Sequence, residues 1–105
     1  MPRHPRPQGQ PPEPGLLILT SLAGGPKHGY AMIEDIERLA GVRLGPGTLY
    51  GALARLEANG LIVALPDDDR RRPYKLTGLG RDLLAERLAS IQGLAEAGLR
   101  RLSVV

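Results

Sequence analysis

Glycine and proline divide residues 16–60 into three short segments, and this punctuation constrains the fold more than any other feature of the sequence. The first segment, residues 16–23, is apolar on nearly every side, so a helix there needs cover from more than one neighbour. The second, residues 28–40, repeats apolar residues at a spacing of three to four, which is typical of an amphipathic helix. Its predicted buried side consists of Met32, Ile33, Ile36, Leu39 and Ala40. The third segment, residues 46–59, starts at a proline and stops before a glycine, as helices commonly do.

The two sides of the third predicted helix differ sharply. One side is an apolar stripe suited to a core, made of Leu49, Ala52, Leu53 and Leu56. The opposite side has no side chain larger than a methyl group, since it consists of Gly47, Gly51, Ala54 and Ala58. An exposed glycine in a helix costs about 1 kcal/mol relative to alanine, so two on one outer side need a reason, and close approach to another surface is one. The edges of this smooth side carry polar side chains suited to the rims of a groove, namely Thr48, Tyr50 and Arg55.

Residues 61–65 and residues 74–76 predict two β-strands joined by a polar loop, PDDDRRRP. The arginines at residues 70–72 of this loop suit phosphate oxygens. The alternative is that the aspartates at residues 67–69 neutralise them in a solvated turn. Three helices followed by a hairpin is the winged-helix order, in which the third helix enters the major groove of DNA and the hairpin loop contacts the flanking backbone. The expected fold class is mostly α with a small β-hairpin, a winged helix-turn-helix.

A long helix is predicted over residues 78–102, with Thr77 as its cap. Small and apolar residues recur along it with gaps of 4, 3, 4, 3 and 4, at Leu84, Leu88, Ile91, Ala95, Gly98 and Leu102. This is the spacing of a helix that packs along another helix. Because a chain of 105 residues buries only a modest core alone, we expect a homodimer. The expected organisation is a winged-helix DNA-binding domain over residues 15–77 and a C-terminal dimerisation helix over residues 78–105.

Residues 1–14 are rich in proline and contain no Leu, Ile or Val. They cannot bury enough apolar surface to offset the entropy of ordering them, which predicts a disordered arm.

Composition narrows the classes of function. The net charge of +3 is spread along the chain, so the case for nucleic acid depends on where individual arginines lie. The chain has no cysteine and only two histidines, so we expect no metal site and no cofactor. It also lacks paired carboxylates in an apolar setting and a glycine loop that would cradle phosphate, and we do not expect an enzyme. No apolar run is long enough to span a membrane and no signal peptide is recognisable, so we expect a cytoplasmic protein without a membrane partner.

Short motifs stand in a fixed order along residues 15–90. They are His28-Gly29-Tyr30, Pro46-Gly47-Thr48-Leu49-Tyr50, Arg55-Leu56-Glu57 with Gly60-Leu61-Ile62, and Tyr74-Lys75-Leu76-Thr77 with Gly80-Arg81. Together they resemble the PadR family of bacterial transcriptional regulators, and the single C-terminal helix resembles the smaller size class of that family. The resemblance implies a repressor that acts as a homodimer on a two-fold operator, with its first and last helices at the dimer interface.

The helical pattern and this resemblance together define the expected site residues. The expected DNA contacts are Tyr30, Gly47, Thr48, Tyr50, Gly51, Arg55, Arg70, Arg71, Arg72 and Lys75. The expected dimer contacts are Leu16, Leu17, Leu19, Leu84, Leu88, Ile91, Ala95 and Leu102. The resemblance implies that Tyr30 and His28 lie where the second helix meets the DNA backbone. The alternative for Tyr30 is a packed tyrosine with its hydroxyl at the surface, and His28 is expected to start a helix rather than to act as a ligand or an acid–base group. The aspartates at residues 67–69 are unexpected in a DNA-facing loop, and we infer that the arginine side of the loop faces DNA.

The expected partners are double-stranded DNA and a second copy of the chain. The resemblance also implies a small apolar compound bound between the protomers, against residues 16–22 and 84–91, and a plain dimer core is the alternative. A rival function is a winged helix that binds protein instead of DNA. Its binding would be insensitive to salt and to changes at residues 70–72.

Overall fold

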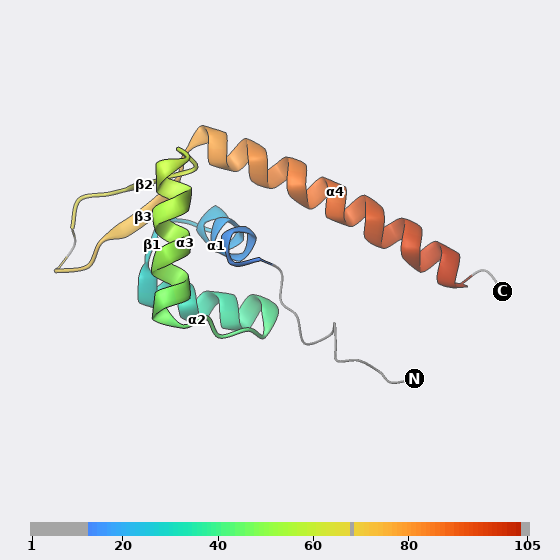
Figure 1. Ribbon diagram of the computed structural model, residues 1–105, viewed down its shortest axis with the longest axis horizontal. Coiled ribbons are helices and arrows are strands. Elements are labelled where there is room, and N and C mark those ends of the chain that lie inside the picture. Colours follow the sequence, from blue (N-terminus) through green and yellow to red (C-terminus); the bar gives the residue numbers. More distant parts are fainter. Residues whose placement is uncertain (1–12, 68, 104–105) are drawn as a thin grey trace.

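The computed structural model describes residues 13–67 and 69–103. Most of the predicted N-terminal arm, together with Asp68 and residues 104–105, lies outside the described residues. The elements follow in the order α1 (Pro14–Ala23), β1 (Lys27–His28), α2 (Gly29–Ala40), α3 (Pro46–Ala58), β2 (Ile62–Ala64), β3 (Pro73–Leu76) and α4 (Gly78–Ser103). Figure 1 shows α1, α2 and α3 gathered beside the small sheet, with α4 extending from it.

The predicted helices are present, and the glycine signals account for two of their ends. Gly41 after α2 and Gly60 after α3 both adopt left-handed φ angles, of 71° and 76°, which glycine reaches without steric cost. The first helix begins two residues before its predicted start, because Pro14 is well suited to a first helical turn. The last helix is capped as predicted, since the Thr77 hydroxyl accepts a hydrogen bond from the Gly80 amide at 3.0 Å.

The core is built around α1, which packs against α2, α3, α4 and β3. Ile18 and Leu22 of this helix are fully buried, as are Met32 and Ile36 of α2. The expectation that the first helix needs cover on more than one side is thereby confirmed. The prediction that Leu39 and Ala40 belong to the buried side of α2 is wrong, because the last turn of that helix leaves the core: Leu39 is 57% exposed and Ala40 is exposed as well.

The sheet has three strands among the described residues, in the order β1-β3-β2, and both pairings are antiparallel. The sequence predicted only the β2–β3 hairpin. The additional strand β1 pairs Lys27 with Tyr74 and His28 with Pro73. A strand of two residues has no pattern of its own, so only the tertiary pairing with β3 reveals it.

The far half of α4 runs away from the rest of the molecule (Figure 1). Arg87 in the near half of this helix forms an ion pair with Glu13, the N-cap residue of α1, at 3.1 Å. The radius of gyration is 15.9 Å, against about 13 Å for a compact chain of about 100 residues. Among the described residues, no helix combines the length and the apolar character needed to cross a membrane.

Candidate nucleic-acid interface

The smooth side of α3 is not covered by the chain itself. Gly47, Ala54 and Ala58 are exposed and Gly51 is partly exposed, while the leucines of the opposite side are buried. A methyl group added at Gly47 would meet nothing within 4 Å. At Gly51 it would meet only the Arg55 guanidinium, at an ordinary 3.7 Å. Another surface can therefore approach the backbone of this helix closely.

Tyr50 and Arg55 lie on opposite edges of this smooth side. Tyr50 is 53% exposed and lines a cavity between α3 and the sheet. Arg55 lines a groove on the other flank, beside α1 and α4. Thr48 is exposed in the first turn of α3. The predicted arrangement, a smooth strip with polar rims, is present.

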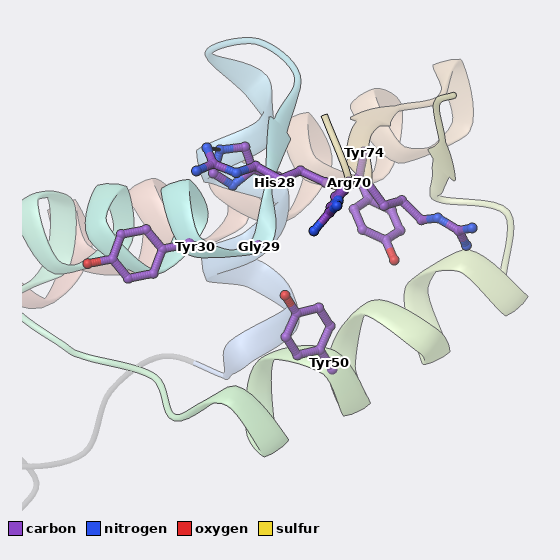
Figure 2. A pocket seen from close by; sticks show the side chains of 8 residues that line it. His28, Gly29, Tyr30, Tyr50, Arg70 and Tyr74 are labelled. Atoms are coloured by element: carbon purple, nitrogen blue, oxygen red, sulfur yellow. Dashed lines mark hydrogen bonds between the residues drawn. The ribbon is translucent and has the colours of Figure 1, made fainter. Parts of the chain in front are cut away.

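The cavity beside Tyr50 brings together five of the ten predicted DNA contacts, Tyr30, Tyr50 and the three arginines of residues 70–72. Its volume is about 360 Å³, and it opens between α3, the start of α2 and the loop of residues 65–72 between β2 and β3, which we call the wing. The lining residues are His28, Gly29, Tyr30, Tyr50, Arg70, Arg71, Arg72 and Tyr74. Figure 2 shows Tyr50 reaching from α3 toward the start of α2, with Tyr74 and Arg70 on the wing side. No carboxylate is among the lining residues, so the cavity favours an anion.

The three arginines of the wing, residues 70–72, do not share one environment. Arg72 forms an ion pair with Asp67, whose carboxylate lies 3.5 Å away, so neutralisation applies to this arginine. Within the described residues, neither Arg70 nor Arg71 has a carboxylate within ion-pair distance, and both are exposed. Asp69 and Arg70 have φ angles of 54° and 70°, the left-handed pair that a tight hairpin turn requires. The tip therefore presents two guanidinium groups beside the cavity.

His28 joins the wing to α2. Its Nδ1 atom accepts a hydrogen bond from the Ala31 amide at 3.4 Å and so caps α2, as expected for a residue that starts a helix. Its Nε2 atom lies 3.0 Å from Nη1 of Arg71, 43 residues further along the chain. This contact was not predicted, because it depends on the tertiary placement of the wing.

Gly29 is a second residue that the sequence reasoning missed as part of the site. A methyl group there would collide with the Tyr50 hydroxyl and lie 2.9 Å from its Cζ atom. The absence of a side chain at this position thus leaves room for the Tyr50 side chain against the start of α2. The sequence signal for this close contact was the glycine within the His28-Gly29-Tyr30 motif.

The other two tyrosines of the cavity differ in environment. Tyr30 is 58% exposed, so the alternative of a packed ring is wrong. Figure 2 shows its hydroxyl directed away from Tyr50. Tyr74 is buried in the sheet, and this burial raises the pKa of its hydroxyl above the ordinary value, with a further contribution from the charge of Glu57.

Lys75 lies apart from the other predicted DNA contacts. It is exposed on β3 opposite Val63 of β2, and it does not line the cavity. Because side chains alternate along a strand, Lys75 and the buried Tyr74 occupy opposite sides of the sheet.

The predicted dimer contacts fall into two groups. Leu17, Leu19 and Leu84 are buried in the core of the single chain, so they offer almost no surface to a partner. Leu16 is partly buried against that core. The remaining four, on α4, are exposed: Leu88, Ile91, Ala95 and Leu102. Two further leucines of α4 that the predicted seam omitted, Leu94 and Leu99, are 75% and 67% exposed.

The fold, the open side of α3 and the adjacent arginine-bearing wing define a winged-helix DNA-binding regulator of transcription. Residues 18–86 match the family model described as the transcriptional regulator PadR-like family. The chain belongs to the PadR family, and the resemblance seen in its motifs is confirmed.

Curated relatives and solved structures agree with this assignment. The chain is 40% identical over 83 residues to the transcriptional regulator Rv3488 of Mycobacterium tuberculosis, covering 76% of this chain and 77% of that protein. It is 51% identical over 80 residues to an uncharacterized 37.1 kDa protein in transposon TN4556 of Streptomyces fradiae, covering 76% of this chain but only 23% of that protein. The chain therefore spans about a quarter of the length of the Streptomyces relative.

Among solved structures, a PadR family transcription regulator from Clostridium difficile has the same fold, with a TM-score of 0.78 at 24% identity, and the match covers 88% of this chain and all of that one. A PadR-like transcription factor from Bacteroides fragilis matches with a TM-score of 0.71 at 28% identity, covering 82% of this chain and 86% of that one. The fold class, a winged helix with an added C-terminal helix, is thus as predicted.

Proposed function

We propose that this regulator binds double-stranded DNA as a homodimer, with α3 in the major groove and the wing on the flanking phosphates. The observation that carries the proposal is the uncovered strip of Gly47, Gly51, Ala54 and Ala58 beside the exposed arginines of the wing. Two such surfaces related by a two-fold axis would meet half-sites about 34 Å apart, one helical turn of DNA.

Affinity would come mainly from phosphate contacts. Each phosphate neutralised by an arginine contributes about 0.9 to the slope of log affinity against log salt. Sequence readout is expected to be thin, because α3 exposes no Asn or Gln on its smooth side and Arg55 is its one long side chain able to pair with guanine. Discrimination would then depend on DNA shape and on apolar contact between Ala54 or Ala58 and thymine methyl groups.

The far half of α4 is the proposed dimerisation surface. Its leucines are exposed in the single chain, and Leu94 and Leu102 are the most exposed of them. A helix with this much apolar surface needs a partner, and a second α4 provides the matching surface. Leu94→Glu is expected to give monomers in analytical ultracentrifugation at micromolar concentration, whereas Glu96→Gln is expected to remain dimeric.

We further propose that the dimer represses transcription and that a small apolar ligand releases it from DNA. A dimer that covers its operator would exclude other proteins from that DNA, and the expected response in a reporter strain is loss of repression on deletion of the regulator. The groove of about 260 Å³ beside α1, α3 and α4 includes Leu16, Leu19 and Leu83 in its lining and is where an apolar effector would bind. A plain dimer core remains the alternative use of this surface.

Binding to DNA is tested by gel shift on the duplex upstream of the regulator's own gene, at two salt concentrations. Tyr50→Ala and Arg71→Ala should each weaken binding without unfolding the dimer, and Arg71→Ala should also lower the salt slope by about 1. Arg100→Ala, which removes an exposed arginine on the side of α4 opposite its apolar seam, is the matched control. Binding that is unchanged in both variants, or that does not respond to salt, would favour the rival function as a protein-interaction module.

A further inference from the structure

The ammonium group of Lys27 lies among oxygen atoms from two helices and a turn. Only 19% of the Lys27 side chain is exposed. An ammonium group has three N–H bonds and no acceptor atom, so it needs acceptors when it is buried. The Nζ atom donates to the Ser21 carbonyl at 2.6 Å and to the Gly25 carbonyl at 3.2 Å. It also lies 3.9 Å from a carboxylate oxygen of Asp35, which matches its charge.

The acceptors of Lys27 belong to three different segments. The Ser21 carbonyl is in the last turn of α1, where a positive charge is favoured, and Gly25 is in the turn that follows. Asp35 is in α2, and its side chain is similarly buried. The same carboxylate accepts a hydrogen bond from the Ser21 hydroxyl at 2.7 Å and pairs with Arg38 at 3.5 Å. Lys27 thus fastens its own strand, β1, to both helices.

The strand that carries Lys27 also holds the root of the wing. β1 consists of Lys27 and His28 alone, and these two residues pair with Tyr74 and Pro73 at the start of β3. Pro73 directly follows Arg72, the last residue of the wing. Because β1 is shorter than the usual strand of roughly three to ten residues, its own ladder fixes its position only weakly. The anchoring of β1 therefore decides where the wing lies relative to α3.

Lys27 does not itself face the proposed DNA surface. Among the described residues, the lining of the cavity beside Tyr50 includes His28 and Gly29 but not Lys27. Residues directly opposite each other in an antiparallel pair share one face of the sheet, so Lys27 lies on the face where Tyr74 is buried. The charge of Lys27 is therefore used within the chain, and an effect of this residue on DNA must pass through β1.

We propose that Lys27 is a positioning residue for DNA binding. The inference rests on the proposed function and adds a residue that does not touch DNA. The ammonium group fixes β1 against α1 and α2, and β1 fixes the wing through β3. Arg70 and Arg71 are thereby held where they reach the phosphates that flank α3. Without the ammonium group, the wing should move more freely and lose phosphate contacts, while α3 remains folded.

The test replaces Lys27 by methionine, which keeps a long apolar side chain and has no ammonium group. Affinity for a labelled duplex is measured by fluorescence anisotropy at several salt concentrations, below the melting temperature of each variant. Lys27→Met should bind roughly tenfold more weakly, as expected for the loss of one hydrogen bond between charged groups. The slope of log affinity against log salt should fall by about 1–2 per protomer, since Arg70 and Arg71 would each contribute about 0.9.

A second measurement follows the wing root directly. Hydrogen exchange at the amides of residues 74–76 should be faster in free Lys27→Met than in the wild type, relative to exchange at the amides of α3. A residue with a purely structural role would lower the melting temperature and leave both the salt slope and this ratio unchanged, because both are measured on folded protein.

Two control variants separate positioning from general effects. Ser21→Ala removes a hydroxyl group from the same cluster but keeps both carbonyl acceptors of Lys27. It should lower stability and keep the wild-type salt slope. Arg100→Ala removes one positive charge from the exposed side of α4 and should also keep the wild-type slope.

The inference is overturned if Lys27→Met keeps the wild-type salt slope, or if either control variant lowers the slope as much. A lower slope without faster exchange at residues 74–76 would mean that Lys27 itself contacts a phosphate, which also overturns it. If Lys27→Met does not fold, Lys27→Gln, which keeps an amide donor for the carbonyls, takes its place and the same outcomes decide. A wild-type protein that binds no duplex would instead refute the proposed function.

Discussion

Replacing Gly51 by alanine should stabilise the protein and weaken its binding to DNA. The added methyl group would meet only the Arg55 guanidinium, at 3.7 Å, so it causes no strain within the chain. Alanine in a helix interior is about 1 kcal/mol more favourable than glycine, which corresponds to a rise in melting temperature of about 4–8 °C for a domain of this size. On DNA, the same methyl group would lie between α3 and the bases. An extra methyl in a closely packed contact costs about 1–3 kcal/mol, so affinity should fall by roughly 5- to 150-fold.

The assay is thermal unfolding by circular dichroism, at one protein concentration, combined with fluorescence anisotropy on a labelled duplex. Gly93→Ala in α4 is the matched control, because a methyl group there meets nothing within 4 Å and so causes no strain either. It should raise the melting temperature by a similar amount and leave DNA affinity unchanged. Full affinity in Gly51→Ala, or an equal loss in Gly93→Ala, would show that the smooth side of α3 does not approach DNA closely.

Three further predictions concern stability. The buried Ser21 hydroxyl donates a hydrogen bond to Asp35 at 2.7 Å and so joins α1 to α2. Ser21→Ala should therefore lower the free energy of unfolding, measured by urea titration, by about 1–2 kcal/mol. An unchanged free energy would contradict the role of this bond. Gly80→Ala would drive a methyl group into the Leu61 carbonyl and should cost about 3 kcal/mol, while Gly78→Ala, with open space around it, should cost nothing. Burial raises the pKa of Tyr74, so the folded state holds this proton more tightly than the unfolded state. Stability should therefore fall as pH rises past the unfolded pKa of about 10, and Tyr74→Phe should fall less between pH 8 and pH 11.

The order of the elements could be predicted because its signals are local. Gly41 and Gly60 end helices through their own backbone conformation, and Thr77 caps a helix through a neighbour three residues away. The smooth side of α3 follows in the same way, since a helical repeat places Gly47 and Gly51 on one side whatever surrounds it.

The rest depends on contacts between distant segments. The short strand β1 exists only because β3 pairs with it, and the contact of His28 with Arg71 joins residues that are 43 positions apart. The apolar pattern of α1 could not separate leucines that face the chain's own core from those available to a partner. Leu17 and Leu19 therefore appeared as dimer contacts although the single chain buries both.

The central claim, that α3 and the wing together form the surface that meets DNA, is tested most directly by titrating the duplex into isotope-labelled protein. The amide resonances of Gly47, Gly51, Arg70 and Arg71 should shift or broaden first, and those of the far half of α4 should stay unchanged. Changes confined to α4 and the groove beside α1, with the amides of α3 unaffected, would contradict the claim.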